Sequence, residues 1–152
     1  MNNGESPGTI TYLENKEIDK AKWDSCITNA GNGLIYARSF FLDAMSRDWD
    51  ALVMGDYLAV MPLLFNKKYG IYYLYQPPFI RFTGIFGNDI NAEKVNKFLA
   101  AIPVKYKYWD IDFKEHLIDF NIIDLINISL KKIYPPIEAM EGSVAVSWHK
   151  DF

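Results

Sequence analysis

Cysteine is almost absent from this sequence of 152 residues. Its single cysteine, Cys26, excludes an internal disulfide and any metal site built from several cysteines. Arginine is nearly as scarce, since only Arg38, Arg47 and Arg81 occur, and the formal net charge is −3. A protein that binds the phosphate backbone of nucleic acids concentrates basic side chains, so we expect no DNA partner.

Long hydrophobic runs are also missing. The longest apolar run spans residues 57–65 and is interrupted by Pro62, whereas a membrane-spanning helix needs roughly 20 apolar residues. The first residues contain neither the basic start nor the apolar stretch of a secretory signal. These absences predict a cytoplasmic protein without a membrane span. Half of the residues are hydrophobic and 23% are charged, which is typical of a single globular domain.

The spacing of the apolar residues predicts the order of strands and helices. Strands are expected at 9–13, 50–54, 57–65, 71–75, 106–113 and 124–132. Helices are expected to begin at Asp19, near Ser39 and at Asn91. The last helix links the strands 71–75 and 106–113, and such a crossover makes its two strands parallel when they are neighbours. We therefore predict an α+β fold, a mixed and mainly antiparallel sheet with helices on its faces.

Five short motifs, rich in aromatic and aliphatic residues, follow one another along the first half of the chain. They are Lys22–Ile27, Leu34–Ala37, Trp49–Val53, Ala59–Leu63 and Tyr72–Phe79. Together with the order of the elements, these motifs resemble the N-terminal half of FemAB-type, GNAT-like proteins of Bacteroidetes, which have the acyl-CoA N-acyltransferase fold. The resemblance covers residues 9–133.

The resemblance implies a domain of the acyl- or aminoacyl-transferase type. Relatives in the wider FemABX group transfer aminoacyl groups from aminoacyl-tRNA onto peptidoglycan precursors, and simpler GNAT members transfer acyl groups from acyl-CoA to amines. Members carry a second GNAT-like half after the first. Residues 1–8 are expected to be a disordered lead, and the resemblance implies a GNAT-like domain at 9–133 and a divergent tail at 134–152, with the second half missing. We expect such a domain to be inactive alone and to self-associate through the surface left uncovered.

The resemblance also assigns a role to the loop before the last expected helix of this domain. In a GNAT domain this loop presents backbone N–H groups to the pyrophosphate of CoA, and its motif is Gln or Arg, two residues, Gly, one residue, and Gly or Ala. The stretch 81–86 matches the first four positions and has Phe86 in place of the last small residue. Arg81, Gly84 and Gly87 are accordingly the candidates for binding acyl-CoA. The alternative is that the glycines only form a turn and that Arg81 is solvated.

Tyrosines and phenylalanines crowd residues 69–86 and indicate a candidate substrate site. Tyr75 and Gln76, at the end of an expected strand, are the candidates for holding a small-molecule or peptide substrate. Their groove is expected between this strand and the one that begins at Tyr106. The alternative is a structural role, in which the rings cover both faces of the sheet.

Two carboxylates complete the candidate chemistry. Asp110 and Asp112 point the same way on an expected strand, about 7 Å apart, so either can be the base that deprotonates an amine, with Tyr75 as a further catalytic candidate. The alternative is a solvated acidic face. His116 and His149 lie far apart and lack the neighbours of a metal site, so no metal is expected.

Two function classes are compatible with these residues. The first is a transferase-type domain that moves an acyl group to an amine by direct attack, without a covalent enzyme intermediate. The second is a non-catalytic module that binds a protein or peptide through its sheet edge and aromatic face.

Overall fold

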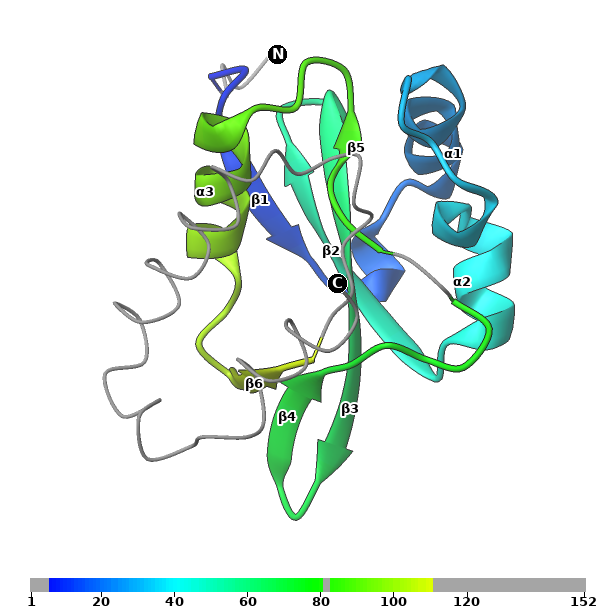
Figure 1. Cartoon of the computed structure of the whole chain (residues 1–152), viewed down its shortest axis with the longest axis vertical. Helices are drawn as coiled ribbons and strands as arrows, with labels where there is room; N and C mark the ends of the chain where they lie inside the picture. The colour runs from blue at the N-terminus through cyan, green and yellow to red at the C-terminus, as the bar shows by residue number, and fades with distance from the viewer. Residues whose placement is uncertain (1–5, 81–82, 111–152) are drawn as a thin grey trace.

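A mixed sheet forms the centre of the computed structural model, which describes residues 6–80 and 83–110 (Figure 1). Its strands are β1 (Ile10–Leu13), β2 (Asp48–Met54), β3 (Ala59–Lys68), β4 (Ile71–Leu74), β5 (Phe86–Gly87) and β6 (Tyr106–Trp109). The order across the sheet is β1-β2-β3-β4-β6, and β5 pairs with β3 outside this path. All pairs are antiparallel except β4 and β6, which are parallel. The mixed, mainly antiparallel sheet is thus confirmed.

Helices cover both faces of this sheet (Figure 1). α1 (Lys20–Asn29) and α2 (Ser39–Met45) pack on one face, and α3 (Ala92–Ala101) packs on the other. Two short 3-10 helices, η1 (Asn15–Glu17) and η2 (Ile35–Ala37), precede α1 and α2, and the sequence pattern does not predict them. The α+β class is confirmed, and so is the crossover in which α3 leads from β4 to the parallel strand β6.

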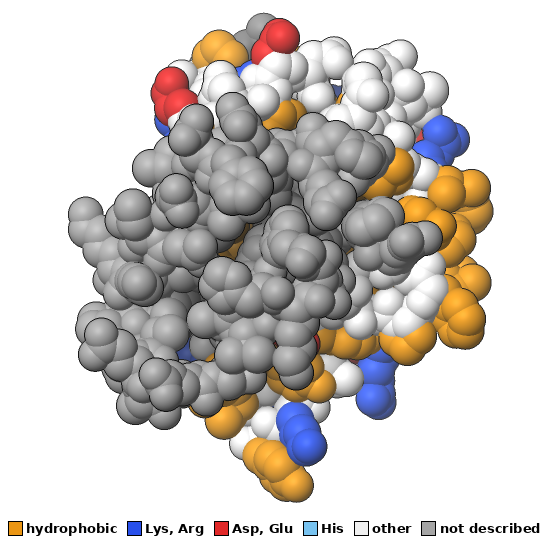
Figure 2. All heavy atoms as spheres, in the orientation of Figure 1, with side chains coloured by type: hydrophobic (Ala, Val, Ile, Leu, Met, Phe, Trp, Pro, Cys, Tyr) orange, Lys and Arg blue, Asp and Glu red, His pale blue; other side chains and the backbone are white. Residues whose placement is uncertain are grey.

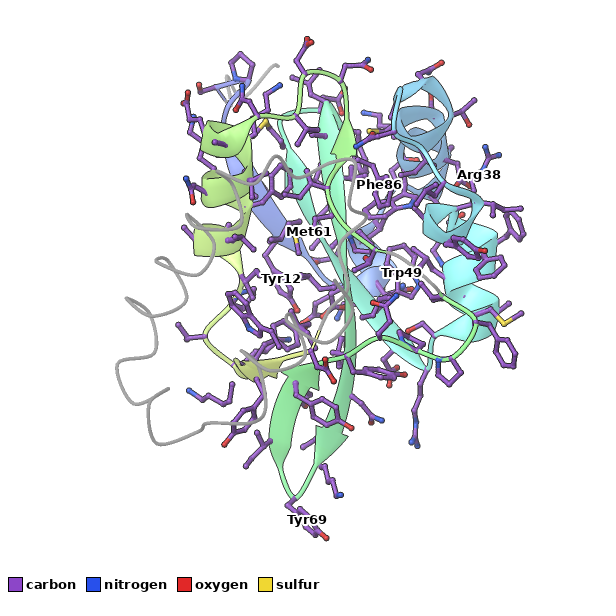
Figure 3. All side chains as sticks on the ribbon, viewed as in Figure 1. Tyr12, Arg38, Trp49, Met61, Tyr69 and Phe86 are labelled. Carbon is purple, nitrogen blue, oxygen red and sulfur yellow. The ribbon has the colours of Figure 1, made fainter. Side chains whose placement is uncertain are left out.

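Each face of the sheet has its own core, because successive side chains of a strand point to opposite faces. On the α3 side the largest buried side chains are Leu52, Met61, Leu63, Leu74, Phe98 and Tyr106. On the α1 side they are Trp23, Leu42, Val60, Ile80 and Phe86. Figure 3 shows Trp49 and Phe86 on the side of α1 and α2, and Tyr12 on the side of α3. The sheet therefore divides the candidate functional residues into two groups.

The helices α1, α2 and α3 begin where the sequence predicts, and α1 and α3 carry the expected side-chain caps. The side chain of Asp19 accepts a hydrogen bond from the backbone N–H of Lys22 at 3.1 Å, and the side chain of Asn91 accepts one from Lys94 at 2.9 Å. Each cap satisfies one of the N–H groups that the first turn of a helix leaves without a partner.

The cap of α3 makes a measurable contribution to stability. We expect Asn91→Ala to lower the free energy of unfolding by about 1 kcal/mol, because the Lys94 N–H loses its acceptor. Urea denaturation followed by circular dichroism measures this loss. Asn91→Asp keeps the acceptor and is the matched control, so an equal loss in both variants would contradict the capping role.

The β3–β4 hairpin differs from the prediction. The break expected between the strands 57–65 and 71–75 shrinks to Tyr69 and Gly70, which both have positive φ (51° and 79°), so β3 continues to Lys68. Two such residues form the tight turn whose twist matches that of its strands.

Pro62 is tolerated inside β3 because its neighbours leave a gap. On one side of β3, β5 pairs only with 59–60 and β4 only with 65–68. The carbonyl of Leu64 accepts from the N–H of Tyr75 on that side, and residues two apart in a strand face the same way. The missing N–H of Pro62 therefore faces the unpaired stretch, where no ladder hydrogen bond is lost.

Several predictions fall outside the described residues. These are the strand 124–132, the tail 134–152 and residues 1–5 of the expected lead.

Candidate functional site

The expected acyl-CoA loop packs into the interior. Residues 83–87 are all buried, and Phe86 and Gly87 form β5, which pairs with Ala59 and Val60 of β3. Phe86 is fully buried in the core on the α1 side (Figure 3). In this part of the loop the backbone lies along the sheet, and a phenyl ring fills the space beneath it.

Asn32 fixes this loop to the segment that follows α1. The Asn32 side-chain oxygen accepts from the N–H of Gly87 at 3.1 Å, and its side-chain nitrogen donates to the carbonyl of Ile85 at 2.9 Å. A Cβ on Gly87 would lie 2.8 Å from the Cβ of Ala59, so the close approach to β3 requires glycine. Gly84 has a φ of 148°, which also favours glycine. Both glycines thus have structural explanations, and the Gly87 N–H already has an acceptor.

The predicted substrate and catalytic residues lie around the end of β4. Tyr75 donates its backbone N–H to Leu64 and packs its ring 6.0 Å from that of Tyr73, while the Gln76 side chain donates to the carbonyl of Ile80. The N–H of Asp110 donates to Leu74 at 3.0 Å, which continues the ladder between β4 and β6. Over their described length these two strands therefore stay paired where a groove was expected. Arg81 and Asp112 lie outside the described residues.

One predicted residue, Gly87, does line a pocket. Its volume is about 300 Å³, and Lys22, Cys26, Asp56 and Asn88 are among its other lining residues. Lys22 and Asp56 form an ion pair across its rim at 2.7 Å. Burial raises the pKa of the Cys26 thiol, which favours its protonated, less reactive form. The pocket has the polar walls of a small binding site but no group poised for catalysis among these four residues.

The chemically densest cluster of the described residues surrounds Asp50, which the sequence analysis does not single out. Asp50 lies on β2 on the α3 side of the sheet, and its side chain is 8% exposed. Its carboxylate accepts hydrogen bonds from the hydroxyls of Tyr12 and Tyr106 (2.9 Å for Tyr106) and from the backbone N–H of Asn15 at 3.0 Å. Three parts of the chain, β1, η1 and β6, are thereby joined to β2 at one carboxylate.

Lys105 brings a positive charge to the same place. Its ammonium nitrogen lies 3.7 Å from Asp50 Oδ2 and donates to the hydroxyl of Tyr12 at 2.7 Å. It also lies near the centres of four aromatic rings, which we call the aromatic cage. The distances from Lys105 Nζ to the ring centres are 5.0 Å for Tyr12, 5.0 Å for Tyr106, 5.5 Å for Tyr72 and 5.8 Å for Phe65. Separations of this size allow attraction between a cation and the ring faces.

The surroundings of the cluster keep Tyr12, Tyr106 and Lys105 protonated. Burial, followed by the hydrogen bond to Asp50, raises the pKa of Tyr12, and burial together with Tyr12 and Asp50 raises the pKa of Tyr106 further. Burial by itself lowers the pKa of Lys105, but the hydrogen bond to Tyr12 and the charge of Asp50 outweigh it and raise the pKa overall. At neutral pH the three groups are therefore donors and do not act as bases.

The sequence contains only part of the signal for this cluster. An aspartate inside the apolar stretch 49–53 is unusual, because a buried carboxylate needs partners. Its partners Tyr12 and Lys105 lie 38 and 55 positions away in the chain, so the fold has to be known before they can be named.

Similarity to known proteins gives no further guide to the site. No family model, curated protein or solved structure matches the chain. Within residues 6–80 and 83–110, no group of three or more His, Cys, Asp or Glu side chains is arranged to hold a metal ion. Among the helices that the structure describes, none combines the length and the apolar character that crossing a membrane requires.

Proposed function

We propose that the chain is a GNAT-like domain of the acyl- or aminoacyl-transferase type that acts on an amine. The parallel pairing of β4 with β6 across the crossover helix α3 supports this proposal most strongly. In the chain, this crossover comes after the antiparallel β2–β3–β4 meander. The helices α1 and α2 precede the meander and cover the face of the sheet opposite to α3. This is the arrangement that the resemblance to FemAB-type, GNAT-like proteins implies.

In the proposed reaction the amine nitrogen attacks the carbonyl carbon of the acyl donor. The C–N bond forms as the bond from that carbon to the CoA sulfur or the tRNA ribose oxygen breaks, and the leaving thiol or hydroxyl takes the proton that the nitrogen loses. Raised pKa values keep Tyr12, Tyr106 and Lys105 protonated. Their cluster therefore serves binding, and Asp110 and Asp112 remain the proposed bases.

Acetyl-CoA binding tests the donor side of the proposal. We expect millimolar acetyl-CoA to raise the melting temperature of the full chain, since a ligand that binds only the folded state stabilises it. Mass spectrometry of mixtures with alkyl diamines then tests acetyl transfer. Absence of stabilisation and transfer with acetyl-CoA, and with aminoacyl-tRNA as the second donor, would overturn the proposal.

Two arginine variants test whether Arg81 belongs to the binding site of the acyl donor. Arg81→Ala should abolish the stabilisation, whereas Arg47→Ala, an exposed arginine distant in sequence, is the matched control and should leave it unchanged. Equal effects of the two changes would remove Arg81 from the donor site.

A non-catalytic binding module is the second candidate function, favoured by an exposed apolar surface beside α2. Figure 2 shows hydrophobic side chains gathered at the edge of the molecule where α2 lies. Ile35 and Phe40 are more than half exposed and line a groove of about 460 Å³ with Ile27, Leu34 and Arg38. The acetyl-CoA experiment separates the two candidates, because a binding module gives neither stabilisation by the donor nor transfer.

A further inference from the structure

The rings of the aromatic cage have contacts of their own besides those with Lys105. Two of its rings, Tyr12 and Tyr106, donate their hydroxyls to the buried carboxylate of Asp50. The rings of Phe65, Tyr72 and Tyr106 pack against one another, with centres 5.6 to 6.5 Å apart. The four rings come from four different strands of one sheet. Walls fixed in this way remain in place when the cation between them is removed.

Lys105, by contrast, reaches the cage from its edge. It lies in the turn between α3 and β6, next to Val104, which is 80% exposed, and its own side chain is 39% exposed. Its long, flexible stem can rotate outward while the backbone of the turn stays in position. The cation of the cage is therefore partly open to solvent and is carried on a flexible stem.

We propose that the aromatic cage is a binding subsite for an alkylammonium group and that Lys105 is its built-in occupant, displaced when a ligand ammonium enters. Four ring faces above a buried carboxylate are the chemistry that recognises a primary ammonium. The inference rests on the proposed function for the role of this ligand as the acceptor.

The cage also restricts the class of acceptor. An ammonium held beside Asp50 keeps its proton, and a protonated nitrogen has no lone pair with which to attack an acyl group. The nitrogen bound in the cage is therefore not the one that reacts. The acceptor must carry two amino groups, one anchored and one acylated, as in an alkyl diamine or a lysine-containing peptide.

Competition with Lys105 predicts how the affinities change. An occupant that is tethered to the site competes as though it were present at high concentration. It therefore lowers the apparent affinity of the site for a free ligand. We expect n-butylammonium to stabilise the Lys105→Ala variant at millimolar concentrations and to bind the unchanged protein at least about tenfold more weakly. Thermal-shift titrations measure both, with n-butanol and with sodium chloride at equal concentration as controls for shape and for ionic strength.

Matched variants make the binding test specific. Lys107→Ala removes an exposed lysine two residues away on β6 and should behave like the unchanged protein. Lys105→Ala combined with Asp50→Asn should lose the response to n-butylammonium. The absence of a response in a folded Lys105→Ala variant would overturn the binding subsite, and equal affinity with and without Lys105 would overturn its role as occupant.

Displacement can be observed directly in the unchanged protein, which covers the case in which the variants fail to fold. Ring currents should shift the side-chain proton signals of Lys105 upfield of those of Lys107 in NMR spectra of protein containing isotope-labelled lysine. Saturation with cadaverine should return the Lys105 signals to ordinary positions, and signals that do not move would contradict displacement. No acyl donor enters these measurements, so failure of acyl transfer and failure of the cage are distinguished.

Discussion

Asp50→Ala is expected to lower the free energy of unfolding by about 3 kcal/mol. The change removes the one acceptor shared by Tyr12, Tyr106 and the Asn15 N–H, and it removes the carboxylate that lies 3.7 Å from the Lys105 ammonium. A buried donor that loses its partner keeps the full cost of leaving water. Urea denaturation at neutral pH measures the loss, and a change below about 1 kcal/mol would show that water replaces the carboxylate.

Asp50→Asn is the matched control, since it preserves shape and one acceptor oxygen while it removes the charge. We expect a loss between that of Asp50→Ala and zero. The difference between the two variants separates the contribution of the hydrogen bonds from that of the charge.

The dependence of stability on alkaline pH tests the same cluster in the protein without a substitution. The ordinary pKa is 10.0 for tyrosine and 10.5 for lysine, and the folded-state pKa of Tyr12, Tyr106 and Lys105 lies above these values. Their contribution to stability is therefore fully present below the ordinary values and is lost as pH rises through the folded-state pKa. From about pH 10 upward the unchanged protein should lose stability more steeply than Asp50→Asn.

Features that depend on neighbouring residues were predictable from the sequence. The caps at Asp19 and Asn91, the strand 71–75 and the parallel crossover all follow from local spacing and chain connectivity, and the structure confirms them to within one residue. The end of β3 was mispredicted because the positive φ of Tyr69 has no signature in composition.

The candidate site was less predictable, because it depends on which strands meet. The glycine pattern at 84–87 was interpreted as an anion-binding loop, whereas the described backbone shows that Gly87 is explained by its approach to Ala59 and by its hydrogen bond to Asn32. The Asp50 cluster needs β1, β2 and β6 in one sheet before its members can be brought together. Periodicity identifies the face on which a side chain lies, and only the fold identifies its partners.

The other large expected effect lies on the opposite face of the sheet. Trp23 is fully buried between α1 and β2, its indole N–H donates to the carbonyl of Ala37 at 2.7 Å, and its ring centre lies 5.1 Å from that of Trp49. Trp23→Ala should lower the free energy of unfolding by about 4 kcal/mol, since it leaves a cavity and a carbonyl without a donor.

Trp23→Phe divides this loss into its two causes. Phenylalanine fills most of the cavity but cannot donate to Ala37, so we expect a loss of about 1–2 kcal/mol in urea denaturation. Near-equal losses in the two variants would mean that the hydrogen bond, and not the volume of the ring, holds η2 against α1. The Lys105 signals should stay shifted in Trp23→Phe, because the aromatic cage and this core lie on opposite faces of β2.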